Sequence, residues 1–151
     1  ILPSVERQSD VPFIMTTRSP YADHALAFVR IVAGVIFISV GSMKVFGFPP
    51  SPMTVPLLSQ MGIGGLIEVV GGILITLGLF TRPVAFILSG EMAVAYFQFH
   101  APQSIYPTTN QGMPAILYCL LYFYMAFAGP GAWSLDGILA GTQTSEVRSR
   151  N

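Results

Sequence analysis

The sequence predicts an all-α integral membrane protein, a bundle of four transmembrane helices with both termini in the cytoplasm. Three observations lead to this prediction. Hydrophobic residues make up 52% of the 151 residues and charged residues only 9%, whereas soluble domains carry about 25% charged residues. The apolar residues form four long runs, each near the roughly 20 residues that cross a bilayer. Arginine, outside the apolar runs, is confined to one side of the resulting topology.

The first two helices are expected over about 24–46 and 62–80. Asp23 is a candidate N-cap for the first, because its short carboxylate can accept from the free N–H groups of a first turn. The connection, 47–61, contains four prolines and no charge, which predicts a loop. Residues 1–22 form a polar, proline-broken tail, and the predicted membrane domain covers 23–140.

The third helix is expected over about 83–100 and the fourth over about 113–128. Pro83 suits a first helical position, where a missing N–H costs nothing. The uncharged loop 101–112 separates the two helices, and Asn110 is a candidate cap for the fourth.

Beyond the fourth helix the chain is expected to leave the membrane. The segment Gly129-Pro130-Gly131 ends that helix, and Trp133 is placed like an interfacial anchor. Ser134 is a candidate cap for a short amphipathic turn, 135–141, and residues 141–151 are expected to be a disordered tail.

The distribution of arginine predicts the orientation. With four crossings, the two termini and the turn between the second and third helices share one side. The loops on the other side carry no Lys or Arg, and positive loop residues favour the cytoplasm. The arginines on the predicted cytoplasmic side are Arg7, Arg18, Arg82, Arg148 and Arg150.

Four charged residues lie inside the apolar runs: Arg30, Lys44, Glu68 and Glu91. An unpaired charge at mid-bilayer costs about 2.5–3.5 kcal/mol on insertion scales, so such residues face partners, a bundle interior or a functional path. We estimate the depth of each charged residue in the membrane by counting about 1.5 Å per residue from the helix ends. Residues at matching depth are predicted to pair, namely Arg30 with Glu91 and Lys44 with Glu68. These pairs serve either to hold the helices in register or to handle a ligand or proton.

Glycines of the second helix support an interior position for Glu68. They recur at a spacing of seven and fall on one stripe with Glu68, where small residues let helices approach closely in lipid. The helix-packing glycines are Gly64, Gly65, Gly71, Gly72 and Gly78.

Composition excludes several function classes. Net charge is zero, which gives no reason to expect nucleic-acid binding. A single cysteine, Cys119, excludes an internal disulfide and a Cys-x-x-Cys redox pair. His24 and His100 lie at opposite membrane faces, roughly 30 Å apart, so they cannot ligate one haem within this chain. We expect no intrinsic cofactor or metal; a bound lipid or quinone is compatible with the sequence.

Several stretches resemble the DoxX family of small bacterial membrane proteins, over about residues 25–137. They are GVIFISVGSMKVFG (34–47), GGLIEVVGGILITLGLFTRPVA (64–85), GEMAVAYFQFH (90–100) and AILYCLLYFYMAFAGPGAWSLD (115–136). The resemblance implies a four-helix bundle in the bacterial inner membrane. Its polar positions correspond to Arg30, Lys44, Glu68, Arg82, Glu91, His100, Asn110 and Asp136. The family's acidic residue before the fourth helix is missing here, where Met113 stands.

Three functions remain open from the sequence. The first, favoured by the lack of redox motifs, is a non-catalytic accessory subunit of a larger membrane complex, in electron transfer by the resemblance. It would dock through the aromatic fourth helix, whose interface candidates are Tyr122, Phe123, Tyr124 and Phe127. The second is the membrane subunit of a quinone-linked oxidoreductase, with a site near Glu68, Glu91 and His100. The third is a transporter of a small solute or of protons.

Overall fold

The computed structural model describes residues 19–50, 52 and 54–141, and this part of the chain is helical without any β-strand. Its elements are α1 (Pro20–Phe46), α2 (Gln60–Leu77), α3 (Thr81–Ala95), the π-helical turn η1 (Tyr96–His100) and α4 (Met113–Ala128). A further helical segment covers 135–141. The predicted all-α class is confirmed for these residues, while the arginines at 7, 18, 148 and 150 and most of both predicted tails lie outside them.

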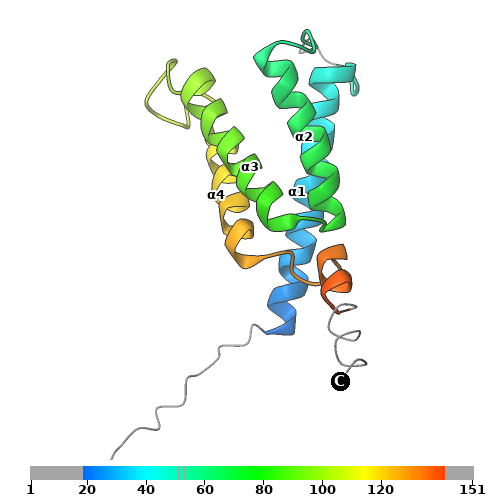
Figure 1. The fold of residues 1–151 in the computed structure, drawn as a ribbon. Coiled ribbons are helices and arrows are strands. Elements are labelled where there is room, and N and C mark those ends of the chain that lie inside the picture. The colour runs from blue at the N-terminus through cyan, green and yellow to red at the C-terminus, as the bar shows by residue number, and fades with distance from the viewer. Residues whose placement is uncertain (1–18, 51, 53, 142–151) are drawn as a thin grey trace, which may run out of the picture.

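The helices form two antiparallel hairpins, α1 with α2 and α3 with α4 (Figure 1). The hairpins lie close together near the turn between α2 and α3, and they diverge toward the opposite end, where the loop 101–112 lies (Figure 1). Contact between α2 and α3 is much less extensive than contact within either hairpin. The start of α1 and the segment 135–141 lie at the same end of the molecule.

Two helices of the described chain are long and apolar enough to cross a membrane, namely residues 21–46 of α1 and the whole of α2. Helix α4 is apolar but has 16 residues, a length of about 24 Å. Helix α3 continues without interruption into η1, so the pair reaches from 81 to 100.

The helix ends follow their local chemistry, with shifts from the predicted limits. Asp23 is not the N-cap of α1, because Pro20 occupies the first turn and Ser19 the cap position, where the fixed φ of proline suits a helix start. Helix α2 starts two residues early, because the Ser59 hydroxyl accepts a hydrogen bond from the first turn at 3.0 Å. It ends early because Gly78 adopts φ 67°, a left-handed conformation that terminates helices.

Asp136 fixes the start of α3, which lies at Thr81 rather than at Pro83. Its carboxylate accepts hydrogen bonds from the backbone N–H groups of Phe80 and Thr81, both at 2.8 Å. Desolvation tends to raise the pKa of Asp136, but these hydrogen bonds and the positive charge of Arg30 outweigh it and lower that pKa. Ser134 caps the segment 135–141 as predicted, since its Oγ accepts from the Gly137 N–H at 3.2 Å.

The glycines of α2 serve two neighbours rather than one seam. Gly65 and Gly72 face α1, where a Cβ on Gly72 would lie 2.7 Å from the Gly34 carbonyl oxygen. Gly64 and Gly71 face α3, where a Cβ on Gly71 would meet the Leu88 side chain at 2.8 Å. Close approach to α1 and room for α3 side chains therefore both depend on α2 having no side chain at these positions.

The aromatic residues of α4 divide between the core and the surface. Tyr122 is fully buried: its hydroxyl donates to the Ala33 carbonyl at 3.2 Å, and its ring meets Phe37 edge-on. The prediction that Tyr122 offers an interface is therefore wrong, because it faces α1 and not the outside. The exposed members of the predicted interface are Phe123, Tyr124 and Phe127.

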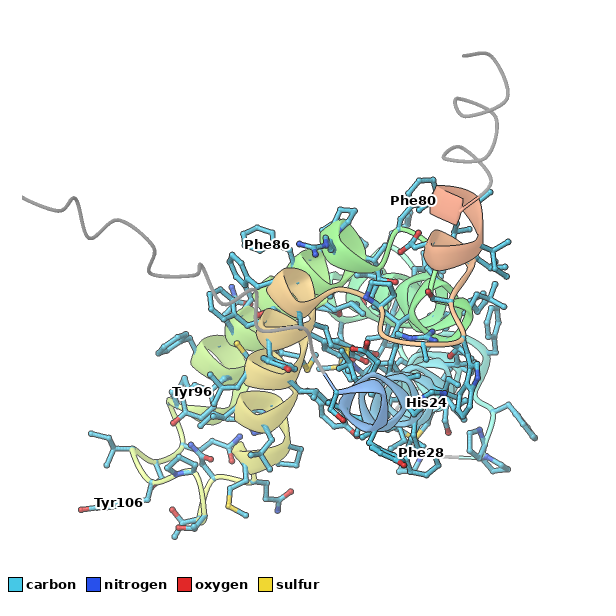
Figure 2. All side chains as sticks on the ribbon, turned by 90° about the horizontal axis from the view of Figure 1, so that it is seen from below. His24, Phe28, Phe80, Phe86, Tyr96 and Tyr106 are labelled. Carbon is cyan, nitrogen blue, oxygen red and sulfur yellow. The ribbon has the colours of Figure 1, made fainter. Side chains whose placement is uncertain are left out.

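Large apolar side chains also cover the outside of the bundle. Phe28 of α1, Phe80 of the α2–α3 turn and Phe86 of α3 project outward in the view along the bundle (Figure 2), and each is more than half exposed. An apolar surface of this extent is unusual for a soluble monomer and suits contact with lipid.

Candidate functional site: a polar pocket above an apolar groove

Arg30 is fully buried and is held entirely by main-chain oxygens. Its guanidinium donates to the carbonyls of Ile75 (2.6 Å) and Thr76 (2.7 Å) at the end of α2. It also donates to carbonyls of the segment that follows α4: Pro130 at 2.9 Å, Ala132 at 3.4 Å and Trp133 at 2.8 Å. We call this arrangement the Arg30 clasp. It joins α1, α2 and the segment 130–133, and it uses all five donors of the side chain.

The predicted pairing of Arg30 with Glu91 is wrong. Helix α1 extends past the turn between α2 and α3, so Arg30 lies level with that turn, as its contacts with Ile75 and Thr76 show. Glu91 lies ten residues into α3, about 15 Å further along the bundle. Counting depth from the helix starts failed because the starts of α1 and α3 are not level. Arg30 thus has a structural role at the end of the molecule remote from the carboxylates.

The predicted pairing of Lys44 with Glu68 is confirmed. Lys44 Nζ lies 2.6 Å from Glu68 Oε1, and the two side chains are 16% and 3% exposed. The other carboxylate oxygen, Glu68 Oε2, is buried and has no hydrogen-bond partner within the described chain. An unsatisfied buried charged oxygen is costly, so this oxygen is a candidate for contact with a ligand.

Glu91 lies beside this ion pair and interacts electrostatically with both Glu68 and Lys44. Gly64 makes room for it: a Cβ there would lie 3.1 Å from Glu91 Oε1. Glu91 Oε2 is also buried without a hydrogen-bond partner among the described residues. Two carboxylates from neighbouring helices thus each present an unpaired oxygen in the same region.

These groups line a pocket of about 240 Å³ between α2, α3 and the end of α1. We call it the head-group pocket. Its polar and small lining residues are Lys44, Gln60, Gly64, Glu68, Glu91 and His100, and its apolar ones are Met61, Met92, Val94, Ala95 and Phe99.

His100 is held in place by the loop that follows it. Its Nδ1 lies 2.9 Å from the Asn110 main-chain oxygen. A carbonyl only accepts, so Nδ1 carries the hydrogen and the neutral ring has Nε2 as an acceptor. Asn110 is buried, and its side chain bonds to the Gly112 N–H at 2.7 Å and the Ser104 carbonyl at 2.8 Å. Asn110 therefore orders the loop before α4, while Gly112 occupies the cap position itself.

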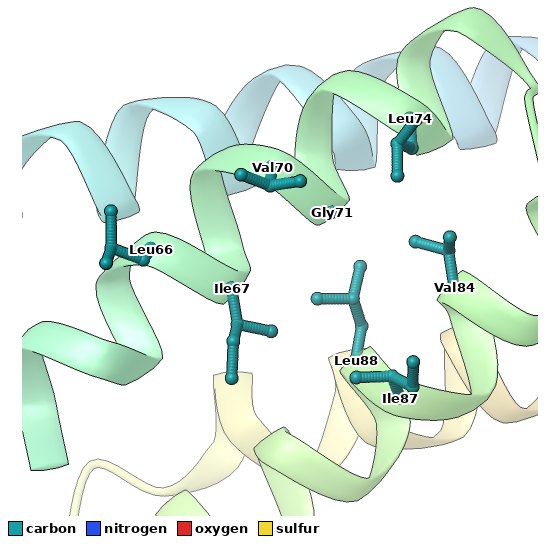
Figure 3. A pocket seen from close by; sticks show the side chains of 8 residues that line it. All are labelled: Leu66, Ile67, Val70, Gly71, Leu74, Val84, Ile87 and Leu88. Atoms are coloured by element: carbon teal, nitrogen blue, oxygen red, sulfur yellow. The ribbon is translucent and has the colours of Figure 1, made fainter.

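An apolar groove follows the head-group pocket along α2 and α3. It encloses about 360 Å³. The pocket uses residues 60–68 of α2 and 91–95 of α3, and the groove uses 66–74 and 84–88 of the same helices. Leu88 reaches across toward Gly71 and forms part of the wall (Figure 3). The lining residues are Leu66, Ile67, Val70, Gly71, Leu74, Val84, Ile87 and Leu88.

Gln60 and Gln98 belong to this region but were not predicted as site residues. The Gln60 side-chain amide donates to the Gln98 side-chain oxygen, linking the start of α2 to η1. Single glutamines in a loop and in a helix carry no sequence pattern that marks a site. The spacing of Gln60, Gly64, Glu68 and Gly71 along one face of α2 is the signal that could have grouped them.

Comparison with known proteins identified a matching family model and two similar bacterial proteins. The DoxX family model matches residues 25–101, which include Arg30, Lys44, Glu68, Glu91 and His100. An uncharacterized protein of Haemophilus influenzae is 44% identical over 131 residues, covering 81% of this chain and 96% of that protein. The inner membrane protein YqjF of Escherichia coli is 27% identical over 124 residues, covering 78% and 93%. No solved structure gives a significant match.

Proposed function

This chain belongs to the DoxX family, and from that premise we propose that it is a non-catalytic membrane subunit that holds an amphiphilic small molecule, a lipid or a quinone, between its hairpins. The family and the inner-membrane relative support a location in a bacterial inner membrane. The observation that carries the proposal is the pair of unpartnered buried oxygens, Glu68 Oε2 and Glu91 Oε2, directly above a groove without charge.

The proposed placement in the bilayer rests on the four apolar runs and on the distribution of arginine in the sequence. All four helices cross, with the α2–α3 turn and both termini in the cytoplasm, so the head-group pocket lies toward the periplasmic end. The ligand's polar end would occupy the pocket, and its chain would run along the groove toward the membrane centre. The pocket with its charged side chains and the apolar groove beside it thus correspond to the polar head and the apolar chain of an amphiphile.

The accessory role is the second part of the proposal. A subunit that binds but does not transform its ligand would act by presenting it to other subunits, in an electron-transfer complex if the ligand is a quinone. The exposed face of α4, with Phe123 and Phe127, offers rigid apolar area for such a partner.

A groove-filling substitution tests ligand binding. Ile87 lines the groove and is 57% exposed, so Ile87→Trp places an indole where the chain would lie without disturbing the core. Phe86→Trp is the matched control, because Phe86 is adjacent in sequence and 61% exposed but does not line the groove. Native mass spectrometry in mild detergent should show a co-purified amphiphile that Ile87→Trp loses and Phe86→Trp retains. Equal retention by both variants would exclude the groove as its site.

A further inference from the structure

The head-group pocket contains two carboxylates but one lysine. Lys44 neutralises Glu68 through their 2.6 Å contact, so ionisation of Glu91 would add a negative charge that this ion pair does not balance. The described residues that line the pocket supply no second Lys or Arg. A desolvated charge without compensation is expensive. A bound group with one positive charge would restore neutrality.

The unpartnered buried atoms of the pocket favour a ligand that donates hydrogen bonds. Lys44 Nζ donates to Glu68 and the Gln60 amide to Gln98, and each of these two groups has further hydrogens to donate. The buried side-chain atoms of the pocket without a partner among the described residues are the carboxylate oxygens Glu68 Oε2 and Glu91 Oε2, which accept hydrogen bonds when ionised. A ligand that fits this pocket is therefore a donor as well as a cation.

We propose that the head-group pocket binds a protonated primary amine whose apolar chain lies in the groove. An –NH₃⁺ group carries one charge and three donors, so it could pair with an ionised Glu91 and donate to both unpartnered carboxylate oxygens. A quaternary ammonium has the charge but no donor, and the carbonyl oxygens of a quinone cannot donate a hydrogen bond to Glu68 Oε2 or Glu91 Oε2. Within the described chain no group of three His, Cys, Asp or Glu could hold a metal ion, so a metal cation fits less well.

This inference rests on the proposed function, because it names the class of amphiphile that the groove would take. Two sources supply the same chemistry, the head group of an aminophospholipid and a free long-chain alkylamine. The full chain, purified in mild detergent, would be titrated with phosphatidylethanolamine, phosphatidylcholine and dodecylamine and followed by native mass spectrometry. The first two lipids differ by three N-methyl groups, so the comparison isolates the donors.

The wild-type protein should prefer phosphatidylethanolamine over phosphatidylcholine by at least about tenfold, the effect of one or more hydrogen bonds to a charged group. Glu91→Gln should abolish the preference. Gly64→Ala, whose Cβ would crowd Glu91 Oε1 at 3.1 Å, should weaken it and serves as the second variant. Gly90→Ala should keep it, because a Cβ at Gly90 meets nothing within 4 Å.

The outcomes separate the two proposals. Binding of phosphatidylethanolamine identifies a lipid source, and binding of dodecylamine alone identifies a free amine; either supports the inference if Glu91→Gln removes it. A different result would be equal affinity for both phospholipids in wild type and in Glu91→Gln, with binding still lost in Ile87→Trp. It would overturn the proposal that the pocket recognises an amine, but not the proposal that the groove binds an amphiphile. Absence of any retained amphiphile would overturn both proposals.

Discussion

Replacing Arg30 with methionine tests the clasp most directly. Methionine keeps an unbranched apolar stem but removes all five donors, leaving the carbonyls of Ile75, Thr76, Pro130, Ala132 and Trp133 without them. One hydrogen bond to a charged group contributes about 1.5–3 kcal/mol net. Five such contributions would together be as large as the whole free energy of unfolding of a typical domain. The five hydrogen bonds therefore cannot contribute additively. Carbonyls at a helix end can also take water.

We therefore expect Arg30→Met to lower the free energy of unfolding by about 3–5 kcal/mol, the range for breaking a buried charged network. For a chain of this size that corresponds to a fall in Tm of roughly 6–20 °C. The sequence contains one tryptophan, Trp133, whose carbonyl accepts from Arg30 at 2.8 Å, so its fluorescence reports on the clasp during thermal unfolding in detergent. Arg82→Met is the control: Arg82 is exposed, and its loss should cost about 0.5 kcal/mol or less.

An unchanged Tm and unchanged Trp133 emission in Arg30→Met would refute the structural role given to the clasp. A fall in Tm of the same size in Arg82→Met would show that any loss of positive charge at this end destabilises the protein. Only a large effect confined to Arg30 supports hydrogen bonding to main-chain oxygens as the cause.

Three further predictions follow from features of the fold. Gly72→Ala should cost about 1–3 kcal/mol because its Cβ would lie 2.7 Å from a carbonyl of α1, whereas Gly90→Ala should be neutral or stabilising by up to about 1 kcal/mol; equal thermal shifts would contradict the close packing of α1 on α2. Because its pKa is lowered in the folded state, Asp136 stabilises the protein above its unfolded pKa of about 3.9, and this contribution is lost as pH falls through the folded pKa. The Tm difference between wild type and Asp136→Asn should thus be constant above about pH 5 and narrow below about pH 4; a difference that stays constant throughout would disprove it. In a cysteine-free background, an impermeant thiol reagent added from the periplasm should label Ile105→Cys and not Phe80→Cys; the reverse would invert the predicted orientation.

Much of the fold could be predicted because the lipid environment makes helix limits readable from apolar runs, proline and glycine. The limits were off by a few residues where local caps decided, as at Ser59 and Gly78. The pairing of Lys44 with Glu68 was predictable because both lie near the same connection, the α1–α2 loop, so depth could be counted from a shared reference.

The site was less predictable where a side chain is bound by main-chain atoms, or where its neighbours depend on how whole helices are arranged. No side-chain pattern announces that Arg30 would be satisfied by carbonyls, and no pattern shows that α1 extends past the α2–α3 turn. Tyr122 and Phe123 are equally aromatic, yet one is fully buried and the other 48% exposed, because only the three-dimensional position of α1 determines which side of α4 it covers. The divergence of the hairpins, which creates the pocket and groove, likewise follows from the arrangement of whole helices.

The Arg30 clasp has a consequence for how this protein changes during evolution. Every amino acid has a carbonyl oxygen, so the side chains at 75, 76, 130, 132 and 133 can be exchanged without removing an acceptor from Arg30. Natural homologues should therefore retain the arginine while its partners drift, and covariation methods should find no correlated positions for it. Lys44 and Glu68 bind through their side chains, so a change in one should be accompanied by a change in the other.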